Sequence, residues 1–571
     1  MSPVLGRWRS PLPPLAVVAF SALAALSEAG ARADTASEIR ALKAAMAQQA
    51  ARLRQLEIKA AAQAKDAAEA KAAAKHATNV ANAAHGKAGE HAPPPVFVSL
   101  KQGGLKIETE DGANMFRVGG RMHLDGGANT HPTLGTSGNA GIRRGRLELE
   151  GRFAHYWLWR LQYEFAGGAA AIGVPGGFRD IFVGFKHPAL AFMPFTKEPV
   201  ILQIGQMFEP FGLEKSTSSN FNDFVERAMA VDAFAPFRNI GAAAVVHGEK
   251  WTAKAGVFTT GPQQDPALRP APGVPVPLGV PAAAGWVPTG GGNYLDLTGR
   301  LTYAPIKEED KLLHFGGSVR WHRPNEAIAS TEARVAAPGN NIRTESNILG
   351  ENLIGTPDLS CGLVRGAAGK CIKDVVVYGA ELAAAYGPLS VQAEYIGARY
   401  NRDPAALARA NAFGAFAPGG ASLDFSGYYV YGTWYLTGES RAAAYTVSDL
   451  NGAGFGQIKI KNPVSKGGFG ALELAARFSA INLNSGPFQG SYYHNLIAVA
   501  PDAFLRGAIA NAGVLGGREQ NVTVGLNWYP EPGVRFMANW TRVVALSAPW
   551  NRAYLDGAHP NLFVMRAQYD F

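Results

Sequence analysis

Basic side chains recur at every second position along many short stretches of the chain, with apolar side chains between them. Arg117 and Arg121 alternate with Phe116, Val118 and Met122, and a period of two places alternate side chains on opposite faces of a strand. A guanidinium group keeps its charge at any working pH and binds phosphate or carboxylate with a planar fork. Rings of such groups in a pore favour anions. The predicted anion path comprises Arg117, Arg121, Arg144, Arg146, Arg152, Arg160, Lys254, Arg300 and Arg320. The same parity adds Lys186, Arg477, Arg535 and Arg566.

Acidic side chains share these faces, so two interpretations stay open. Either the basic residues form a selective anion path, or they pair with carboxylates and leave a mixed, weakly selective lumen. The acidic residues assigned to the inward faces are Asp125, Glu148, Glu150, Glu164, Asp180, Glu381, Glu394, Glu473 and Asp570.

The stretch 205–240 lacks strand alternation and places charged residues beside aromatic ones. We expect a long loop here that folds into the lumen and sets its narrowest point. Its predicted cations are Lys215, Arg227 and Arg238, and their predicted partners are Glu209, Glu214 and Glu226.

The strands that carry these residues have their apolar faces outside. In the last stretch, 561–571, Phe563, Met565 and Tyr569 share one face, while Arg566 and Gln568 share the other. A membrane barrel turns its apolar face to lipid and its polar face to the lumen. The terminal Phe571 resembles the C-terminal signature of bacterial outer-membrane barrels. Alternation predicts about sixteen strands, near 116–125, 144–153, 157–165, 179–187, 199–207, 241–247, 251–259, 294–303, 312–322, 375–386, 389–399, 424–437, 468–481, 520–529, 533–542 and 561–571.

A soluble two-sheet protein is disfavoured because the strands carry too much aromatic bulk for one core. We instead expect aromatic belts at the membrane interfaces. The residues assigned to these belts are Trp157, Trp159, Tyr429, Tyr431 and Tyr435.

Short and long connections alternate, as they do in barrels with periplasmic turns and extracellular loops. Tight turns are predicted at 154–156, 248–250, 387–388 and 530–533. Long loops are predicted at 126–142, 208–240, 260–293, 323–374, 400–423, 482–519 and 543–560. The connection 438–467 falls where a short turn is expected. It is either an elaborated turn or a missed hairpin near Gln457–Lys461.

The N-terminal part predicts export and a separate module. Arg7 and Arg9 precede an apolar run from Leu15 to Leu26, and Ala31-Arg32-Ala33 fits a signal-peptidase site. We therefore assign residues 1–33 to a signal peptide. A heptad seam runs through residues 34–90, which predicts a periplasmic helical coiled-coil segment that oligomerises or touches the cell wall. A Pro-rich linker is expected at 91–104, followed by the barrel at 105–571.

Charge and motif content disfavour a nucleic-acid-binding protein and a hydrolase, and the cysteines predict a disulfide. Cys361 and Cys371 are the two cysteines of the 571 residues, and after export we expect them to form a disulfide. The formal charge of +9 is modest for this length, so no nucleic-acid partner is expected. The chain shows neither G-x-S-x-G nor H-E-x-x-H, which disfavours a hydrolase. We expect no cofactor and no metal.

Several motifs together resemble the phosphate-selective porin O and P family. They are GQMFEPFGLE at 205–214, SSNFNDFVER at 218–227, FRNIG at 237–241, YGAELAAAYGPLSVQAEY at 378–395, GYYVYGTWYLTGESR at 427–441, ELAARFS at 473–479 and VTVGLNWYP at 522–530. The resemblance covers about 105–571. It implies a sixteen-stranded barrel, a homotrimer and diffusion of anions, and it implies that 438–467 is a family feature.

The expected protein is an all-β, 16-stranded antiparallel transmembrane β-barrel with an N-terminal α-helical coiled-coil segment. It would lie in the outer membrane of a Gram-negative bacterium, in contact with lipid, and pass small inorganic anions such as phosphate or polyphosphate. Two alternatives stay open. One is a weakly selective general porin, and the other is a carbohydrate or dicarboxylate channel. In either, the coiled coil would act as an envelope tether.

Overall fold

The structure is a computed structural model that describes most of the chain beyond residue 94. The described residues are 95–101, 104–131, 135–166, 177–192, 198–259, 295–323, 372–412, 420–486 and 513–571, with short pieces at 47, 196, 344–346, 353–356 and 359. The chain divides into two units, Met1–Pro93 and Pro94–Phe571. The predicted signal peptide, coiled coil and disulfide pair Cys361 and Cys371 lie outside the described residues.

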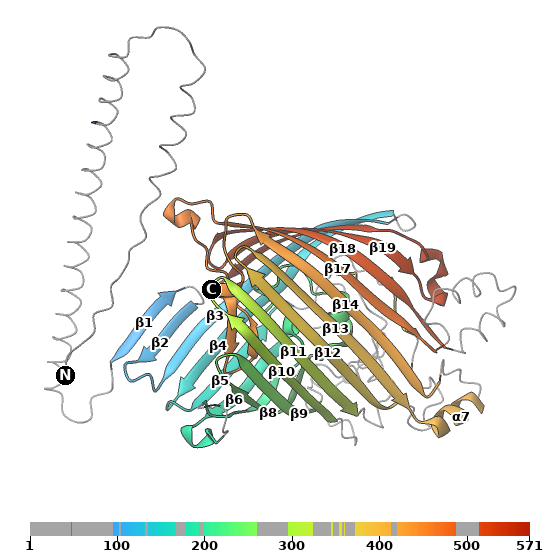
Figure 1. The fold of residues 1–571 in the computed structure, drawn as a ribbon, viewed down its shortest axis with the longest axis horizontal. Helices are drawn as coiled ribbons and strands as arrows, with labels where there is room; N and C mark the ends of the chain where they lie inside the picture. Colours follow the sequence, from blue (N-terminus) through green and yellow to red (C-terminus); the bar gives the residue numbers. More distant parts are fainter. Residues whose placement is uncertain are drawn as a thin grey trace, which may run out of the picture. The chain divides into compact units, whose positions relative to one another are not determined.

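Sixteen antiparallel strands close into a barrel, as the alternation predicts (Figure 1). Each strand pairs with its neighbours along the chain, and the last pairs with the first, with Met565 opposite Gly126. The strands are β3 (Met115–His131), β4 (Gly135–Phe153), β5 (Trp157–Glu164), β6 (Gly177–Lys186), β7 (Ile201–Phe208), β8 (Arg238–His247), β9 (Trp251–Thr259), β10 (Leu295–Lys307), β11 (Lys311–Arg323), β12 (Ile372–Tyr386), β13 (Leu389–Arg402), β14 (Ser422–Tyr435), β17 (Ala471–Ser485), β18 (Val514–Glu531), β19 (Val534–Ser547) and β20 (Asn561–Asp570).

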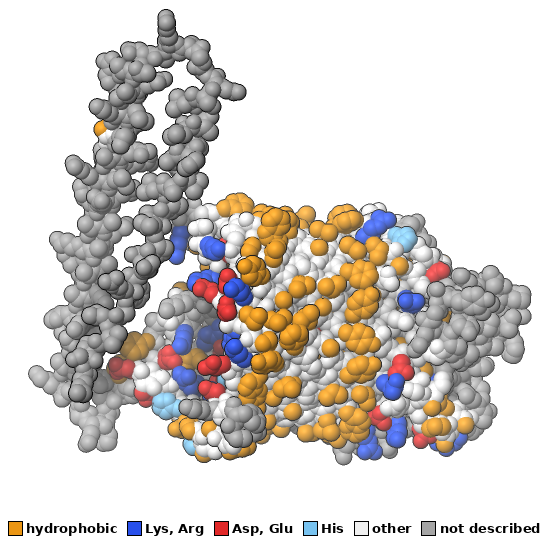
Figure 2. All heavy atoms as spheres, viewed as in Figure 1, with side chains coloured by type: hydrophobic (Ala, Val, Ile, Leu, Met, Phe, Trp, Pro, Cys, Tyr) orange, Lys and Arg blue, Asp and Glu red, His pale blue; other side chains and the backbone are white. Residues whose placement is uncertain are grey.

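The outer surface of the wall is apolar. On β20, Phe563 is 50% exposed whereas Val564 is 5% exposed, and the difference repeats along the strand. Figure 2 shows hydrophobic side chains spread over the barrel wall. This orientation confirms that the apolar face of the alternating strands points outward. Among the described residues, no helix has the length and apolar character needed to cross a membrane.

Two predicted connections are wrong. The stretch 126–142, expected to be a loop, belongs mainly to β3 and β4, which stay paired as far as His131 opposite Gly135. His123 pairs with Arg144 and Leu124 with Ile142, so Arg143 is an extra residue that breaks the period of two on β4. On β3, the outward positions Gly126, Ala128 and Thr130 lack the large apolar side chains that would have marked a strand. Within the expected linker, Val96–Lys101 form β1, which pairs with β2 (Gly104–Thr109). Their β-branched and apolar residues favour a strand over a linker.

The assignment of Tyr429, Tyr431 and Tyr435 to a lipid-facing belt is also wrong. All three are buried on the inner face of β14, whereas Tyr428 and Trp434 face outward. The reason is that a loop remote in the sequence covers this part of the inner wall and excludes water, so large side chains fill the space. Trp157 does lie on the exposed outer face.

The connection 438–467 is an elaborated turn that contains a small hairpin of its own. Its strands, β15 (Tyr445–Ser448) and β16 (Gly452–Phe455), form a two-stranded sheet that is not part of the sheet of the barrel wall. The hairpin therefore lies at 445–455, and the suggested position near Gln457–Lys461 is wrong. The remaining helical turns are η1 (Pro188–Leu190), α3 (Leu213–Ser216), α4 (Met229–Phe234), α7 (Pro404–Ala412), η4 (Ala442–Ala444), η5 (Val464–Lys466) and η7 (Trp550–Leu555).

Candidate functional site: the lumen and its loop

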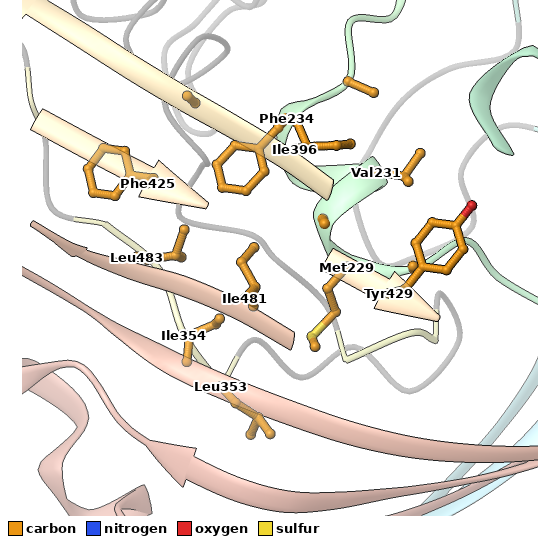
Figure 3. Packing of buried hydrophobic residues seen from close by; sticks show 14 of the residues in the cluster. Met229, Val231, Phe234, Leu353, Ile354, Ile396, Phe425, Tyr429, Ile481 and Leu483 are labelled. Carbon is orange, nitrogen blue, oxygen red and sulfur yellow. The ribbon is translucent and has the colours of Figure 1, made fainter. Parts of the chain in front are cut away.

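The loop between β7 and β8, residues 209–237, folds into the barrel and packs on one side of it. We call it the lumen loop. Its helix α4 supplies Met229, Val231 and Phe234 to an apolar cluster with residues of β13, β14 and β17 (Figure 3). The wall residues that Figure 3 labels in this cluster include Ile396, Phe425, Tyr429, Ile481 and Leu483. Burial of this face fixes the loop against β12–β14 and β17.

Hydrogen bonds fix the first part of the lumen loop to the same wall. The Glu394 carboxylate on β13 accepts bonds from the backbone N–H of Leu213 (3.1 Å) and Glu214 (2.6 Å), and from the Tyr429 hydroxyl (2.6 Å). Gly212 has φ +63°, and a Cβ there would lie 2.6 Å from a Glu394 oxygen. The position requires glycine because both the left-handed backbone and the close carboxylate exclude a side chain.

The middle of the lumen loop reaches the strands where the barrel closes. The Arg566 guanidinium on β20 bonds Asp125 on β3 (2.7 Å) and Glu226 of the loop (3.0 Å). Arg143 on β4 bonds Glu226 as well, at 2.8 Å. Burial alone would raise the pKa of Glu226, but Arg143, Arg144 and Arg566 hold it well below its usual range. The loop therefore spans the lumen between a hydrogen-bonded anchor at Glu394 and an ion-paired anchor at Arg143 and Arg566.

The cations predicted for the stretch 205–240 do not bond the carboxylates of Glu209, Glu214 and Glu226, which are their predicted partners. Arg238 bonds Asp180 of β6 at 2.5 Å. Arg227 donates to the backbone oxygens of Glu214 (3.0 Å) and Thr217 (2.9 Å). The loop acids pair instead with wall arginines, as in the contact between Arg320 and Glu209 at 3.3 Å. Proximity in the sequence suggested ion pairs within the loop. In the fold, guanidinium groups of the wall lie closer to the loop carboxylates than the loop cations do.

Two neighbouring groups of the lumen loop have strongly shifted protonation. Lys215 is buried, with its ammonium group 3.7 Å from the centre of the Phe237 ring. Burial lowers the pKa of Lys215 to about 7 and raises the pKa of Glu214 to about 7. Both shifts follow from the cost of keeping a charge away from water.

The opposite wall, β3–β6 and β8, carries a continuous row of ion pairs. Arg117 and Arg160 both bond Glu150, at 2.7 and 2.9 Å. Arg160 also lies 3.8 Å from Asp180, which Arg238 bonds in turn. Three guanidinium groups thus share two carboxylates. The side chain of Arg117 is 31% exposed and that of Glu150 19% exposed, so this end of the row borders open space. We call this part of the barrel the open wall.

Further predicted residues extend the open wall. Arg146 bonds Glu164 at 3.0 Å, and Arg152 bonds Glu108 of β2 at 2.9 Å. Arg121 pairs with Glu148 and also donates to the hydroxyl of Ser219 in the lumen loop at 2.9 Å. These contacts confirm that inward basic residues pair with inward acids.

Other predicted path residues lie under covering segments. Arg300 bonds Glu381 at 2.7 Å, and their side chains are only 3% and 1% exposed. Arg320 bonds Asp296 at 2.6 Å beneath the lumen loop. Lys254 donates to the backbone oxygen of Leu450 at 2.8 Å. The structure therefore divides the predicted set into residues beside open space and residues beneath the loop or the turn.

The turn 438–467 contacts the lumen loop inside the barrel. Arg441 bonds Asp223 of the loop at 2.7 Å and lies 3.7 Å from the centre of the Phe455 ring. The Thr217 hydroxyl accepts from the backbone N–H of Phe455 at 3.3 Å. A small, partly open cleft lies between the lumen loop, the turn and the strand ends. Its lining includes Phe221, Arg441, Ile460, Tyr529, Arg535 and Asp570. Sequence reasoning missed Arg441 and Asp223, because nothing in their local pattern shows that the two segments meet.

Comparison with known proteins agrees with this geometry. The family model for phosphate-selective porin O and P matches residues 116–571. The chain belongs to this family. This porin is 26% identical to Porin O of Pseudomonas aeruginosa over 479 residues, which are 83% of the chain and 92% of that relative. It is 25% identical to an uncharacterised protein of Caulobacter vibrioides over 473 residues, 81% of the chain and 75% of the relative.

Solved structures of outer-membrane channels resemble this porin at low identity. The channel DcaP of Acinetobacter baumannii is 11% identical, with a TM-score of 0.41, over 81% of this chain and 99% of that one. The family match and the barrel together make the protein an outer-membrane porin. Within the described residues, no group of three His, Cys, Asp or Glu side chains could hold a metal ion.

Proposed function

We propose that this porin lets small anions, phosphate among them, diffuse passively along the open wall. The observation that supports the proposal is the row Arg117–Glu150–Arg160–Asp180–Arg238, in which guanidinium groups alternate with carboxylates and the Arg117–Glu150 end borders open space. A guanidinium fork matches a phosphate or carboxylate oxygen pair. The row therefore offers an entering anion a favourable wall.

Transport along such a wall needs weak, repeated contacts. A conducting pore must offset the dehydration of an ion and still release it. Each guanidinium of the row is already bonded to a carboxylate, so its attraction for a second anion is reduced. An anion would enter at the loop end, pass the lumen loop, and move along the row toward the turn end. The turn end faces the periplasm, because barrels place their short turns there.

A weakly selective general porin is the second candidate. The pairing of Arg121, Arg146 and Arg160 with carboxylates favours it, since paired charges leave a smaller net field in the lumen. The two functions differ in the size of the anion preference rather than in the path. A carbohydrate or dicarboxylate channel, considered from the sequence, has no separate structural support in the described lumen.

Assembly and export complete the proposal. We keep the homotrimer that the family resemblance implies. Residues 1–33 remain the proposed signal, and residues 34–90 the proposed periplasmic coiled coil that tethers the barrel to the envelope.

Reversal potentials of the purified porin in planar bilayers under a salt gradient test the function. We expect an anion preference, and we expect added phosphate to reduce the chloride current because phosphate occupies the row. A reversal potential that indicates cation preference would contradict the proposal. An anion preference with no effect of phosphate would favour the general porin.

A further inference from the structure

The hairpin of the turn 438–467 crosses the lumen and ends on the wall formed by β6–β9. Its tip, residues 448–452, is a tight turn in which the Ser448 hydroxyl accepts from the backbone N–H of Asn451 at 2.9 Å. Gly452 takes φ +77°, which suits glycine at the end of such a turn. The tip places Asp449 and Leu450 against the far wall.

Leu450 attaches the tip to the wall through its backbone and its side chain. Its carbonyl accepts bonds from the Lys254 ammonium group (2.8 Å) and the Gln203 amide (3.1 Å). Its side chain packs on an apolar patch formed by Phe182, Met207, Ala243 and Phe258. Leu450 therefore supplies an apolar anchor that does not depend on the charge next to it.

Asp449 brings the one carboxylate of the tip to a group of basic side chains. Its oxygens lie 2.9 Å from the Lys186 ammonium group and 2.9 Å from a ring nitrogen of His247. The His247 hydrogen bond and the Lys186 charge outweigh burial and hold the pKa of Asp449 below its usual value, so the carboxylate is ionised. Lys186 also lies 3.4 Å from Glu198, whose side chain is the more exposed of the two.

These basic groups lie at the turn end of the barrel, where the proposed anion path leaves the lumen. Lys186 ends β6, His247 ends β8, and Lys254 lies in the first half of β9. Without Asp449, Glu198 would offset part of the Lys186 charge, and the exit would hold an anion more tightly. Release from a pore requires that no site binds the ion too tightly.

We propose that Asp449 is a specificity-determining residue, which neutralises the basic exit formed by Lys186 and His247 and so limits both the anion preference and the hold on phosphate. This inference rests on the proposed anion path. It gives the turn 438–467 a role in selectivity that is separate from its role in narrowing the lumen.

The test compares Asp449→Asn with a matched control, Glu309→Gln. Glu309 pairs with Lys459 at 3.3 Å, both side chains are exposed, and the substitution changes the net charge by the same amount. We expect Asp449→Asn to raise the anion-to-cation permeability ratio by about twofold, because one unit charge acts strongly within a Debye length. The phosphate concentration that halves the chloride current should fall as well. Glu309→Gln should change neither.

A double variant separates charge from structure. In Asp449→Asn with Lys186→Met, one cation leaves with the anion, and we expect the permeability ratio to return toward that of the unmodified porin. The inference is overturned if Asp449→Asn leaves the ratio unchanged, if Glu309→Gln raises it equally, or if the double variant stays as anion-selective as Asp449→Asn. Each comparison is relative to the unmodified porin. A cation preference of the unmodified porin would therefore contradict the proposed function, whereas the inference on Asp449 is judged by the differences between the variants.

Discussion

The open wall and the wall beneath the lumen loop have the same strand alternation but different interiors. On the open wall, inward side chains are charged, paired and partly exposed, as in Arg117 with Glu150. On β12–β14 the inward side chains are buried, and aliphatic and aromatic residues such as Val377, Ile396 and Tyr429 are prominent among them. The lumen loop covers the second wall and leaves the first in contact with open space.

The difference shows that the inner face of a barrel is defined by what covers it. A strand exposed to water needs charged or polar side chains, and each carboxylate then draws a guanidinium partner. A covered strand behaves like a protein core, where polar groups persist only with hydrogen-bond partners. Tyr431, which donates to Asp223 at 2.7 Å and lies against Phe224, is such a residue. We expect the open wall to control selectivity and the covered wall to control the position of the loop.

Phe224→Ala should have the largest effect, because it removes a fully buried ring between loop and wall. The ring centre lies 5.3 Å from that of Tyr431 and 4.3 Å from the Arg477 guanidinium. Truncation of a buried Phe costs about 3–5 kcal/mol, so we expect a clear drop in thermal stability in detergent and larger, noisier single-channel currents. Phe221→Ala, at a half-buried position of the same loop, is the control. Equal effects of Phe224→Ala and Phe221→Ala would contradict the claim that the lumen loop covers this wall and excludes water from it.

Arg160→Gln should have the next largest effect, and on selectivity more than on stability. Loss of this guanidinium uncovers Glu150 and Asp180, so the row loses one cation and its carboxylates are less shielded. We expect the anion preference in bilayer recordings to fall severalfold. Arg399→Gln serves as the control, because Arg399 is exposed and pairs with Asp424 outside the lumen. A selectivity unchanged by Arg160→Gln would remove the row from the path.

A smaller effect should come from pH, through the neighbouring Glu214 and Lys215. Both have a pKa of about 7 in the folded loop. Below that pH Glu214 is neutral and Lys215 is charged; above it Glu214 is charged and Lys215 is neutral. The pair therefore passes from net positive to net negative as pH rises. We expect the anion preference to decrease between about pH 5.5 and about pH 8.5, on either side of that pKa.

The double variant Glu214→Gln with Lys215→Met should remove most of this pH dependence. If the reversal potential of the double variant still changes with pH as in the unmodified porin, the titrating groups lie elsewhere.

Alternation predicted the barrel well, because each wall strand repeats the same period of two and the apolar parity faces lipid throughout. It failed for Tyr429 and Tyr431, because their covering residues lie some 200 positions away in the chain, in the loop around Asp223 and Met229. It also failed for the loop partners. Glu226 pairs with Arg143 and Arg566, which only closure of the barrel brings together. The extra residue Arg143 hid the length of β4, because it breaks the alternation of that strand.

The central claim is that the path follows the open wall and the lumen loop seals the other. The most direct test introduces single cysteines in a background with Cys361→Ser and Cys371→Ser. Arg160→Cys places the thiol on the open wall, and Gln392→Cys places it on β13 beneath the loop. A small anionic methanethiosulfonate is then added while single-channel current is recorded. We predict a stepwise loss of current for Arg160→Cys and no change for Gln392→Cys. Equal or faster modification of Gln392→Cys would contradict the account.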